Sequence, residues 1–323
     1  MKSAGARFAA VLVVGALLPS GASPQAWPSK PVRVIAASSP GSGVDIVARV
    51  VSQRLSEQLG QQVVVDNRAG AGGNLGAEIA AKAAPDGYTL FMATPAHAIN
   101  TGLYRKLNYD LVRDFAPVSL ITTGQYVIVI HPSLPAKSVR ELIALGRQQA
   151  GQLNYASAGN GNATHLAGEL FKSLARVQMV HVPYKGSGPA LTDLIGGQVE
   201  LMFSNLTAAI PHIKSGRLRA LAVTGRERAP SIPDLPTVIE AGVSGYVVTS
   251  WFGVMAPAAT PREIVVRVNA ELGRAMRAPD MRDRLAAEGA EPTFSTPEAL
   301  GTFIGTEIAT WTKVVRDAGV RAD

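Results

Sequence analysis

Two short loops rich in Ser, Gly and Asn have the composition of an anion-binding site. The first loop spans Ser38–Asp45 and the second loop spans Ser157–His165. In each, glycines let the backbone approach a ligand, and the residues that follow have the apolar spacing of a helix. The first amides of a helix lack intrahelical acceptors and lie at the positive end of its dipole. The spacing therefore predicts two helix N-termini that could hold one small anion without an obligatory Lys or Arg.

Small, hydroxyl and amide side chains of these loops are the candidate ligand contacts. Ser42 with Asp45 also fits a capping box, in which the Asp45 carboxylate accepts from a backbone amide and not from a ligand. Both roles are compatible with the spacing. The candidates are Ser38, Ser39, Gly41, Ser42, Gly43, Val44, Asp45, Ser157, Gly161, Asn162, Ala163, Thr164 and His165.

A third group of candidates follows the expected strand 88–94. The carboxyl ends of strands border the ligand crevice in open α/β sheets, so Thr94, Ala96 and His97 are candidates for one wall. A structural role fits His97 equally well. Further along, Lys185 and Ser187 lie in a segment that we interpret mainly as fold-defining, although both could face the cleft.

Other kinds of site lack their sequence patterns. Neither glycine loop matches G-x-G-x-x-G and there is no Walker A sequence, which argues against dinucleotides and nucleoside triphosphates. The five histidines are scattered and there is no Cys, so neither a metal site nor another cofactor is expected. No G-x-S-x-G elbow is present. Ser157 and His165 nevertheless lie close together in the second loop, which keeps a Ser/His hydrolase as an alternative.

Alternating strand-like and helix-like segments must position these loops. The expected strand 31–37 precedes the expected helix 45–60, whose apolar residues share one face and which ends at Gly60. The strand 62–67 completes a βαβ unit. The same alternation recurs at 73–94, 138–157 and 163–184. This pattern predicts an α/β protein with mostly parallel sheets, whose domains, if there are two, are joined by strands and not by a flexible tether.

The N-terminus has the features of a secretory signal peptide. Lys2 and Arg7 precede the apolar run Phe8–Leu18, and small residues follow it, so cleavage is expected after Ala26, with Ala22 also fitting. The run is too short to span a bilayer, and a chain without Cys has no lipid-attachment site. We therefore expect an exported, periplasmic protein, with a retained anchor as the alternative.

Composition and charge favour an exported globular protein over a nucleic-acid binder. The 323 residues with 47% hydrophobic content suit one large or two medium domains. Removing residues 1–26 lowers the formal net charge from +7 to +5, and the remaining Lys and Arg are spread along the chain. No basic run indicates a nucleic-acid partner. A modestly basic surface is compatible with solubility or with attraction of anionic ligands. We expect the protein to be a monomer.

Seven segments form an ordered set along the mature chain. They are GQQVVVDNRAGAGGNLGAEIAAKAAPDGYTL, TPAHAINTGLY, YASAGNGNATHLAGELF, VHVPYKGSGPALTDLIGGQVELMF, IPHIKSGRLRALAVT, IPDLPTVIEAG and WFGVMAPAATP. Together they resemble the Bug family of extracytoplasmic solute receptors, the binding proteins of tripartite tricarboxylate transporters.

The resemblance implies a type II periplasmic-binding-protein fold with two α/β lobes. It also implies a small carboxylate ligand in the interlobe cleft and delivery to integral membrane transporter subunits, so the protein is expected to be a receptor and not an enzyme. A ligand sensor for a membrane signalling partner is another alternative. The expected divisions are a signal peptide at 1–26, lobe one at 27–126 and 250–323, and lobe two at 127–249.

Three positions depart from the family pattern. The family's first loop usually resembles P-F-A-P-G-G-x-T-D, whereas here Ser38 replaces an aromatic residue and Val44 replaces a Thr or Ser. Ser204 stands where an Asp is common, so the resemblance makes Ser204 a further candidate contact without the charge that suits a ligand ammonium. These departures imply a bulkier or less polar carboxylate than an amino acid.

Overall fold

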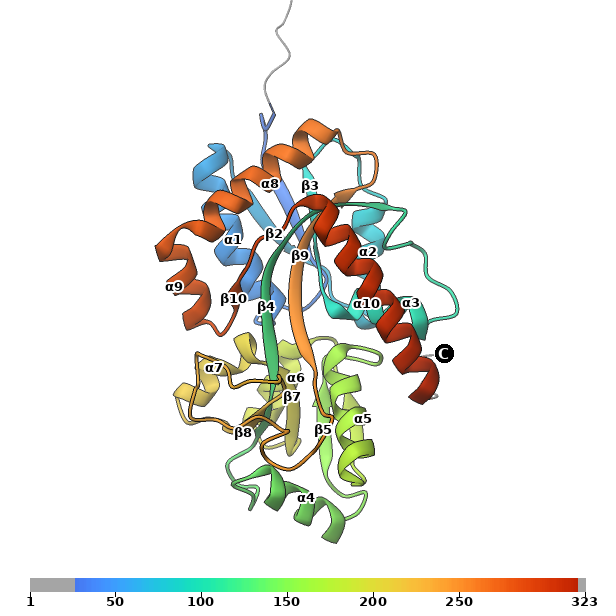
Figure 1. Cartoon of the computed structure of the whole chain (residues 1–323), viewed down its shortest axis with the longest axis vertical. Helices are drawn as coiled ribbons and strands as arrows, with labels where there is room; N and C mark the ends of the chain where they lie inside the picture. The colour runs from blue at the N-terminus through green and yellow to red at the C-terminus, as the bar shows by residue number, and fades with distance from the viewer. Residues whose placement is uncertain (1–26, 319–323) are drawn as a thin grey trace, which may run out of the picture.

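The chain forms two α/β halves joined by crossing strands, as the computed structural model shows for residues 27–318 (Figure 1). Its strands follow the order β2-β1-β3-β9-β4-β7-β5-β6, and β8 and β10 also pair with β4. The expected signal peptide and its cleavage site lie outside the described residues.

The first half, uppermost in Figure 1, begins with the predicted βαβ unit. β1 (Val32–Ala36) pairs in parallel with β2 (Val63–Asn67) and β3 (Thr89–Ala93). α1 (Gly43–Leu59) connects β1 to β2 and ends at Gly60, whose φ of 65° favours glycine. The other helices of this half are η1 (Ala71–Gly73), α2 (Asn74–Ala81), α3 (Pro95–Leu103), α8 (Arg262–Arg277), α9 (Pro279–Ala287) and α10 (Pro297–Ala318).

The second half repeats the parallel arrangement. β5 (Asn154–Ser157) pairs in parallel with β6 (Val180–Pro183) and β7 (Leu201–Asn205). The second loop connects β5 to α5 (Ala163–Ala175), which matches the helix expected from the sequence. The remaining elements are α4 (Val139–Gln148), α6 (Ser187–Ile195), α7 (Leu206–Lys214) and β8 (Arg219–Val223).

Two antiparallel strands connect the halves. β4 (Phe115–Ile130) pairs with β9 (Thr249–Pro257) as far as Gln125 and with β7 from Tyr126 onward. The short strand β10 (Glu291–Pro292) also runs antiparallel to β4. The prediction of mostly parallel sheets is therefore wrong at the centre of the molecule, because strands that pass between the halves run against their neighbours. We propose that the lobes divide at this change of partner, as 27–126 with 250–323 and 127–249.

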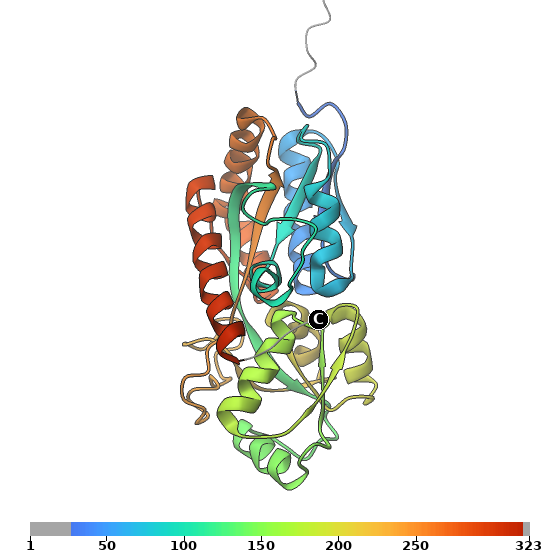
Figure 2. The ribbon, with the colours of Figure 1, turned by 90° about the vertical axis from the view of Figure 1, so that its right-hand side faces the viewer.

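The C-terminal helix packs along the first half and reaches the second. Figure 2 shows α10 running down one side of the first half, with its end beside the second half. Its Trp311 packs against buried clusters of both halves. None of the helices in the described part of the chain combines the length and the apolar character that crossing a membrane requires.

Aromatic rings fill the core of the second half. Phe203 is fully buried and lies 5.4 to 6.4 Å, between ring centroids, from Tyr155, Phe171 and Tyr246. Because this core supports the strand that carries the second loop, its packing fixes the position of that loop.

Phe203→Ala is expected to lower the free energy of unfolding by about 3–5 kcal/mol, since it leaves a cavity among rings that cannot fully collapse into it. Urea unfolding followed by circular dichroism measures this. The matched control is Leu174→Ala on α5, where the side chain is 41% exposed and the loss should stay below about 0.5 kcal/mol. Equal losses in the two variants would contradict this view of the core.

Candidate functional site

The cleft between the halves contains two adjoining cavities. The larger has a volume of about 270 Å³ and the smaller about 50 Å³. Residues of both halves line both of them, and the two cavities share part of their lining. The shared lining residues are Ala37, Ser38, Gly72, Gly73, Ala158 and Asn162.

Six helices present their N-terminal ends to the smaller cavity. Three belong to the first half and three to the second, whereas sequence reasoning identified only two. At the starts of α1, α3, α5, α6 and α7, amides of the first turn lack intrahelical acceptors, and the helix dipoles place partial positive charge there. At the start of α2, η1 already supplies acceptors for the Gly73 and Asn74 amides. The lining residues at these ends are Gly43 of α1, Gly73 before α2, Thr94 before α3, Asn162 before α5, Ser187 of α6 and Asn205 before α7.

The side chains around this space carry almost no formal charge. No Asp or Glu is found among the residues of the described chain that line either cavity, and Lys185 is the one basic residue there. An anion in the cleft would therefore meet backbone dipoles and hydroxyl or amide groups, and no carboxylate would repel it.

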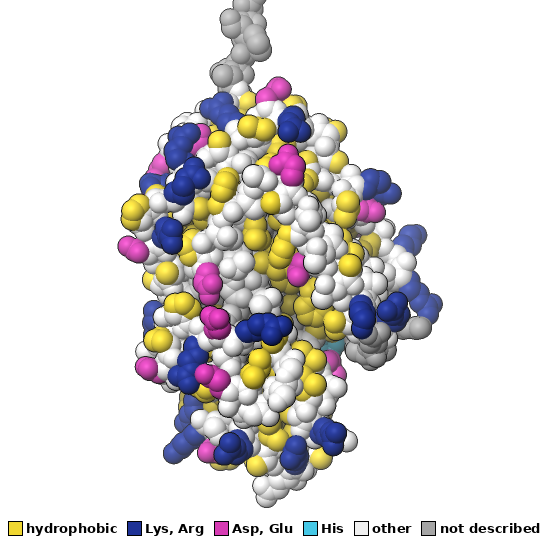
Figure 3. All heavy atoms as spheres, in the orientation of Figure 1, with side chains coloured by type: hydrophobic (Ala, Val, Ile, Leu, Met, Phe, Trp, Pro, Cys, Tyr) yellow, Lys and Arg dark blue, Asp and Glu magenta, His cyan; other side chains and the backbone are white. Residues whose placement is uncertain are grey.

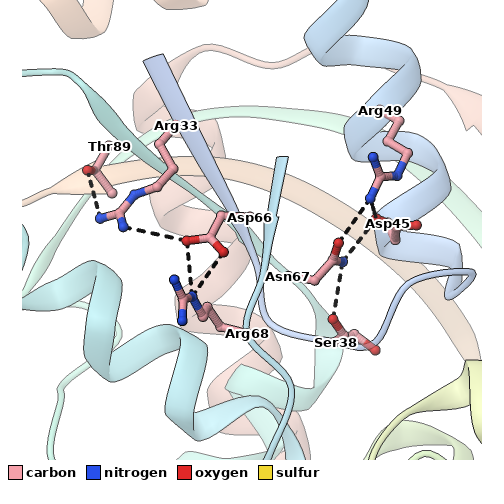
Figure 4. Close-up of polar contacts among 8 residues, drawn as sticks. All are labelled: Arg33, Ser38, Asp45, Arg49, Asp66, Asn67, Arg68 and Thr89. Atoms are coloured by element: carbon pink, nitrogen blue, oxygen red, sulfur yellow. Dashed lines mark hydrogen bonds and ion pairs between the residues drawn. The ribbon is translucent and has the colours of Figure 1, made fainter. Parts of the chain in front are cut away.

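Asp45 uses its carboxylate inside the protein. It is 3% exposed, and its Oδ2 accepts from the Gly41 amide at 2.9 Å. Its Oδ1 accepts from Asn67 Nδ2 and pairs with Arg49 Nη2, both at 2.9 Å (Figure 4). Asn67 in turn donates to the Ser38 carbonyl at 3.2 Å. Of the two roles considered for Asp45, the structure places it in the capping and bracing role.

The second loop is braced in a similar way. Asn162 caps α5, its Oδ1 accepting from the Thr164 amide at 3.1 Å. Thr164 Oγ1 accepts from the Ala158 amide at 2.8 Å. The Ser157 hydroxyl is completely buried, and its histidine partner is His181 at 2.6 Å, not His165. The hydrolase alternative rested on Ser157 with His165, and this geometry offers a substrate in the cleft no access to the hydroxyl.

Thr94 and His97 form a capping box at the start of α3. His97 Nδ1 accepts from the Thr94 amide at 3.0 Å, and the ring is 1% exposed. Burial lowers the pKa of His97 to about 4, so the imidazole is neutral near pH 7. His97 therefore holds the wall of the cleft from behind, while Thr94 lines it.

The structure divides the sequence candidates into two groups. Those that line the cavities are Ser38, Ser42, Gly43, Val44, Thr94, Ala96, Asn162, Ala163 and Thr164. Those that lie behind this lining or beside it are Ser39, Gly41, Asp45, His97, Ser157, Gly161, His165 and Ser204.

Ser204 is fully buried on β7, where its hydroxyl donates to the Asn205 carbonyl at 3.2 Å. Its position therefore says nothing direct about a ligand ammonium. The described cavity lining has no acidic residue, and this absence disfavours a ligand that carries an ammonium group.

The two halves touch across the cleft. Ser39 Oγ accepts from the Gly188 amide of the other half at 3.2 Å. Gly43 faces the Asn205 side chain so closely that an added Cβ would overlap its amide. Gly161 likewise faces Leu103. Glycine at these positions allows the halves to close on each other.

Several lining residues were missed from the sequence. The segment Gly70–Gly73 lines the larger cavity, and its strand, glycines and helix repeat the pattern of the two recognised loops. That repeat was the available signal. Tyr104, Tyr126 and Tyr184 also line the cavities, and no local sequence pattern distinguishes them from core tyrosines.

Within residues 27–318, no group of three or more His, Asp or Glu side chains is arranged to hold a metal ion. The site is therefore described by its amides, hydroxyl groups and small side chains.

Residues 47–320 match the family model described as tripartite tricarboxylate transporter family receptor. Protein BugT of Bordetella pertussis is 38% identical over 91% of this chain and 91% of its own length. Rpa4515 of R. palustris, solved with adipate, is 40% identical with a TM-score of 0.89, over 91% of this chain and 99% of that one. MatC of Rhodopseudomonas palustris, solved with bound malate, is 34% identical with a TM-score of 0.85, over 90% of this chain and 100% of that one.

Acidification is expected to destabilise the protein through His97. Its pKa is about 4 in the folded state and about 6.5 when unfolded, so below pH 6.5 the unfolded chain binds a proton that the folded chain does not. This difference should remove about 2 kcal/mol of stability between pH 7 and pH 5. Urea unfolding at both pH values should show a smaller loss in His97→Gln than in the wild type. An identical loss in the two proteins would contradict this assignment.

Proposed function

The chain belongs to the tripartite tricarboxylate transporter receptor family, and we propose that it binds a small carboxylate between its two halves and delivers it to integral membrane transporter subunits. The observation that supports the ligand class most directly is the convergence of six helix N-termini on a cavity without acidic lining residues among those described. A carboxylate supplies the acceptor oxygens and the negative charge that such an arrangement lacks.

Backbone groups can supply enough binding free energy for this role. A hydrogen bond to a charged group contributes about 1.5–3 kcal/mol. Roughly four of them, less the cost of ordering, would reach the −8 kcal/mol that corresponds to micromolar affinity. The first-turn amides at Gly43, Val44, Ala96 and Ala163 are the donors we assign to this grip.

The family consists of solute receptors and not of enzymes. Two relatives were solved with adipate and with malate, both of them dicarboxylates. For this chain we propose transport, and a ligand sensor that signals through a membrane partner is the other role compatible with the same site. The ligand chemistry is common to both, so the partner distinguishes them.

We place the mature protein in the periplasm as a monomer, after cleavage of the expected signal peptide. The charge pattern supports a freely soluble receptor: on the face drawn in Figure 3, Lys and Arg side chains are interspersed with Asp and Glu. Interspersed charges of both signs favour solubility over adhesion to a polyanion.

The cavity lining also bears on which carboxylate is bound. A ligand ammonium would lose its hydration without meeting an acidic side chain among the described lining residues, and an unpaired buried charge costs several kcal/mol. Ser38 leaves more room in the first loop than an aromatic residue would, and Val44 lacks the hydroxyl donor that a Thr would supply. We therefore propose aromatic or branched mono- and dicarboxylates as ligands in preference to amino acids.

Carboxylate affinity should depend on close approach of the backbone more than on Lys185. Gly43→Val places a side chain against Asn205 of the other half and should weaken binding at least about tenfold by holding the halves apart, while each half still folds. Gly161→Val, which meets Leu103, should act in the same direction. Lys185→Ala, the control for a salt bridge, should change affinity less than about threefold. Calorimetry with adipate and malate, after circular dichroism confirms folding, measures these effects, and loss of binding in Lys185→Ala alone would overturn the dipole argument.

A thermal-shift panel at pH 7 tests the ligand class. Aromatic and branched mono- and dicarboxylates should give larger shifts than aspartate or glutamate, because the amino acids bring an ammonium without a partner. At a hundredfold excess over its dissociation constant, a true ligand stabilises the protein by about 2.7 kcal/mol. The largest shift coming from glutamate or aspartate would show that the site does accommodate an ammonium, and the absence of any shift would count against the carboxylate proposal itself.

A further inference from the structure

Two stacked imidazoles lie directly behind the second loop. The rings of His165 on α5 and His181 on β6 are 3.9 Å apart between centroids, with planes inclined by 15°. Tyr155 on β5 stacks on His181 at 5.0 Å. None of these three rings lines the cleft cavities. The ligand contacts proposed above therefore leave both histidines without a role.

Each imidazole is connected to a backbone amide of the loop. His165 Nδ1 accepts from the Gly161 amide at 3.2 Å. His181 acts through Ser157, whose Oγ lies 2.6 Å from His181 Nε2 and accepts from the Gly159 amide at 3.1 Å. A separation of 2.6 Å suits a hydroxyl donor better than an imidazole N–H donor, because O–H hydrogen bonds are the shorter ones. The single hydroxyl proton of Ser157 has two acceptors within reach, His181 Nε2 at 2.6 Å and the Gly159 carbonyl at 3.3 Å. We assign the proton to the shorter contact, so that both imidazoles serve as acceptors.

The surrounding groups favour the neutral form of both rings. Burial lowers the pKa of His181 to about 4, with a further lowering from His165, and burial also lowers the pKa of His165. Glu169 is the acid facing the pair, 3.9 Å from His165 Nε2, but it also accepts from Lys172 at 2.8 Å and from the Tyr155 hydroxyl at 2.5 Å. The negative charge of Glu169 raises the pKa of both histidines, but the positive charge of Lys172 lowers it.

We propose that His165 and His181 are positioning residues, whose neutral imidazoles hold the Gly159 and Gly161 amides so that the loop presents the N-terminus of α5 to the ligand. This inference rests on the proposed function for its consequence, since the presented amides are those assigned to the carboxylate. The holding of the loop itself is a property of the ligand-free protein. Because the Gly159 and Gly161 amides donate hydrogen bonds to groups on the side away from the cleft, the backbone between Gly159 and Ala163 is fixed relative to the cleft.

The protonation state and tautomer of each ring give the first test. Nitrogen NMR of the ligand-free, full-length mature protein at pH 7 should show His165 with its proton on Nε2 and His181 with its proton on Nδ1. His181 should remain neutral at pH 6. A cationic His181 at pH 6, or a proton on either accepting nitrogen at pH 7, would overturn the proposal.

Amide hydrogen exchange in the same protein gives the second test. His165→Leu should speed exchange at Gly161, and His181→Leu should speed it at Gly159, each about fivefold or more, as loss of one hydrogen bond implies. His165→Asn, which can place an acceptor near the Nδ1 position, should restore the wild-type rate at Gly161 within about twofold. Exchange at Val34 in β1 should stay unchanged in all variants, which separates loop release from general destabilisation. Unchanged exchange at Gly159 and Gly161 in the Leu variants would refute the proposal.

Binding of adipate by calorimetry links the loop to the ligand. His165→Leu should weaken adipate at least about fivefold, and His165→Asn should recover most of that loss. If exchange rises while adipate affinity is unchanged, the histidines hold a loop that the ligand does not need, and the positioning role is wrong. If the wild type binds no carboxylate, the proposed function fails, while the tautomer and exchange results still decide whether the imidazoles hold the loop.

Discussion

Six helix N-termini that face one cleft impose the constraint on which the rest of the site depends. At all of them except the start of α2, first-turn amides have no intrahelical acceptors, and the helix dipoles place like partial charges close together. Closing the halves on an empty cleft leaves this field without a counter-charge. A bound anion compensates both the dipoles and the unpaired donors. This arrangement of helix starts is the physical basis for the proposed anionic ligand.

Some acceptor side chains lie behind the lining of the cleft and hold amides near the helix starts. Asp45, His97 and His165 each accept from an amide near a helix start, and each lies behind the cavity surface. The amides that donate to these side chains are already hydrogen-bonded, so only the other amides at the helix starts are available to a ligand. The neutral state of His97 serves the same end, because only a neutral imidazole can accept from the Thr94 amide.

Local patterns in the sequence predicted the elements better than their assembly. The helices that begin at Gly43 and Ala163 follow from apolar spacing and from capping residues that act within a few positions. The antiparallel passage of β4 and β9 depends on pairing between residues more than a hundred positions apart, which no local pattern encodes. The same distance hid the partner of Ser157: His165 is near it in sequence, but the register of β5 on β6 brings His181 to its hydroxyl.

Affinity and selectivity are assigned to different atoms of this cleft. The contacts that we assign to the smaller cavity are made by backbone amides, which a substitution alters only if it moves the chain. Backbone donors recognise a carboxylate but distinguish little beyond it, since they meet one end of the ligand. The larger cavity shares Gly73 and Asn162 with the smaller one and adds the longer side chains of Tyr104, Tyr184 and Lys185. For the proposed carboxylate ligand we therefore assign selection to the side chains that only the larger cavity adds, and capture of the carboxylate group to the helix starts around the smaller one.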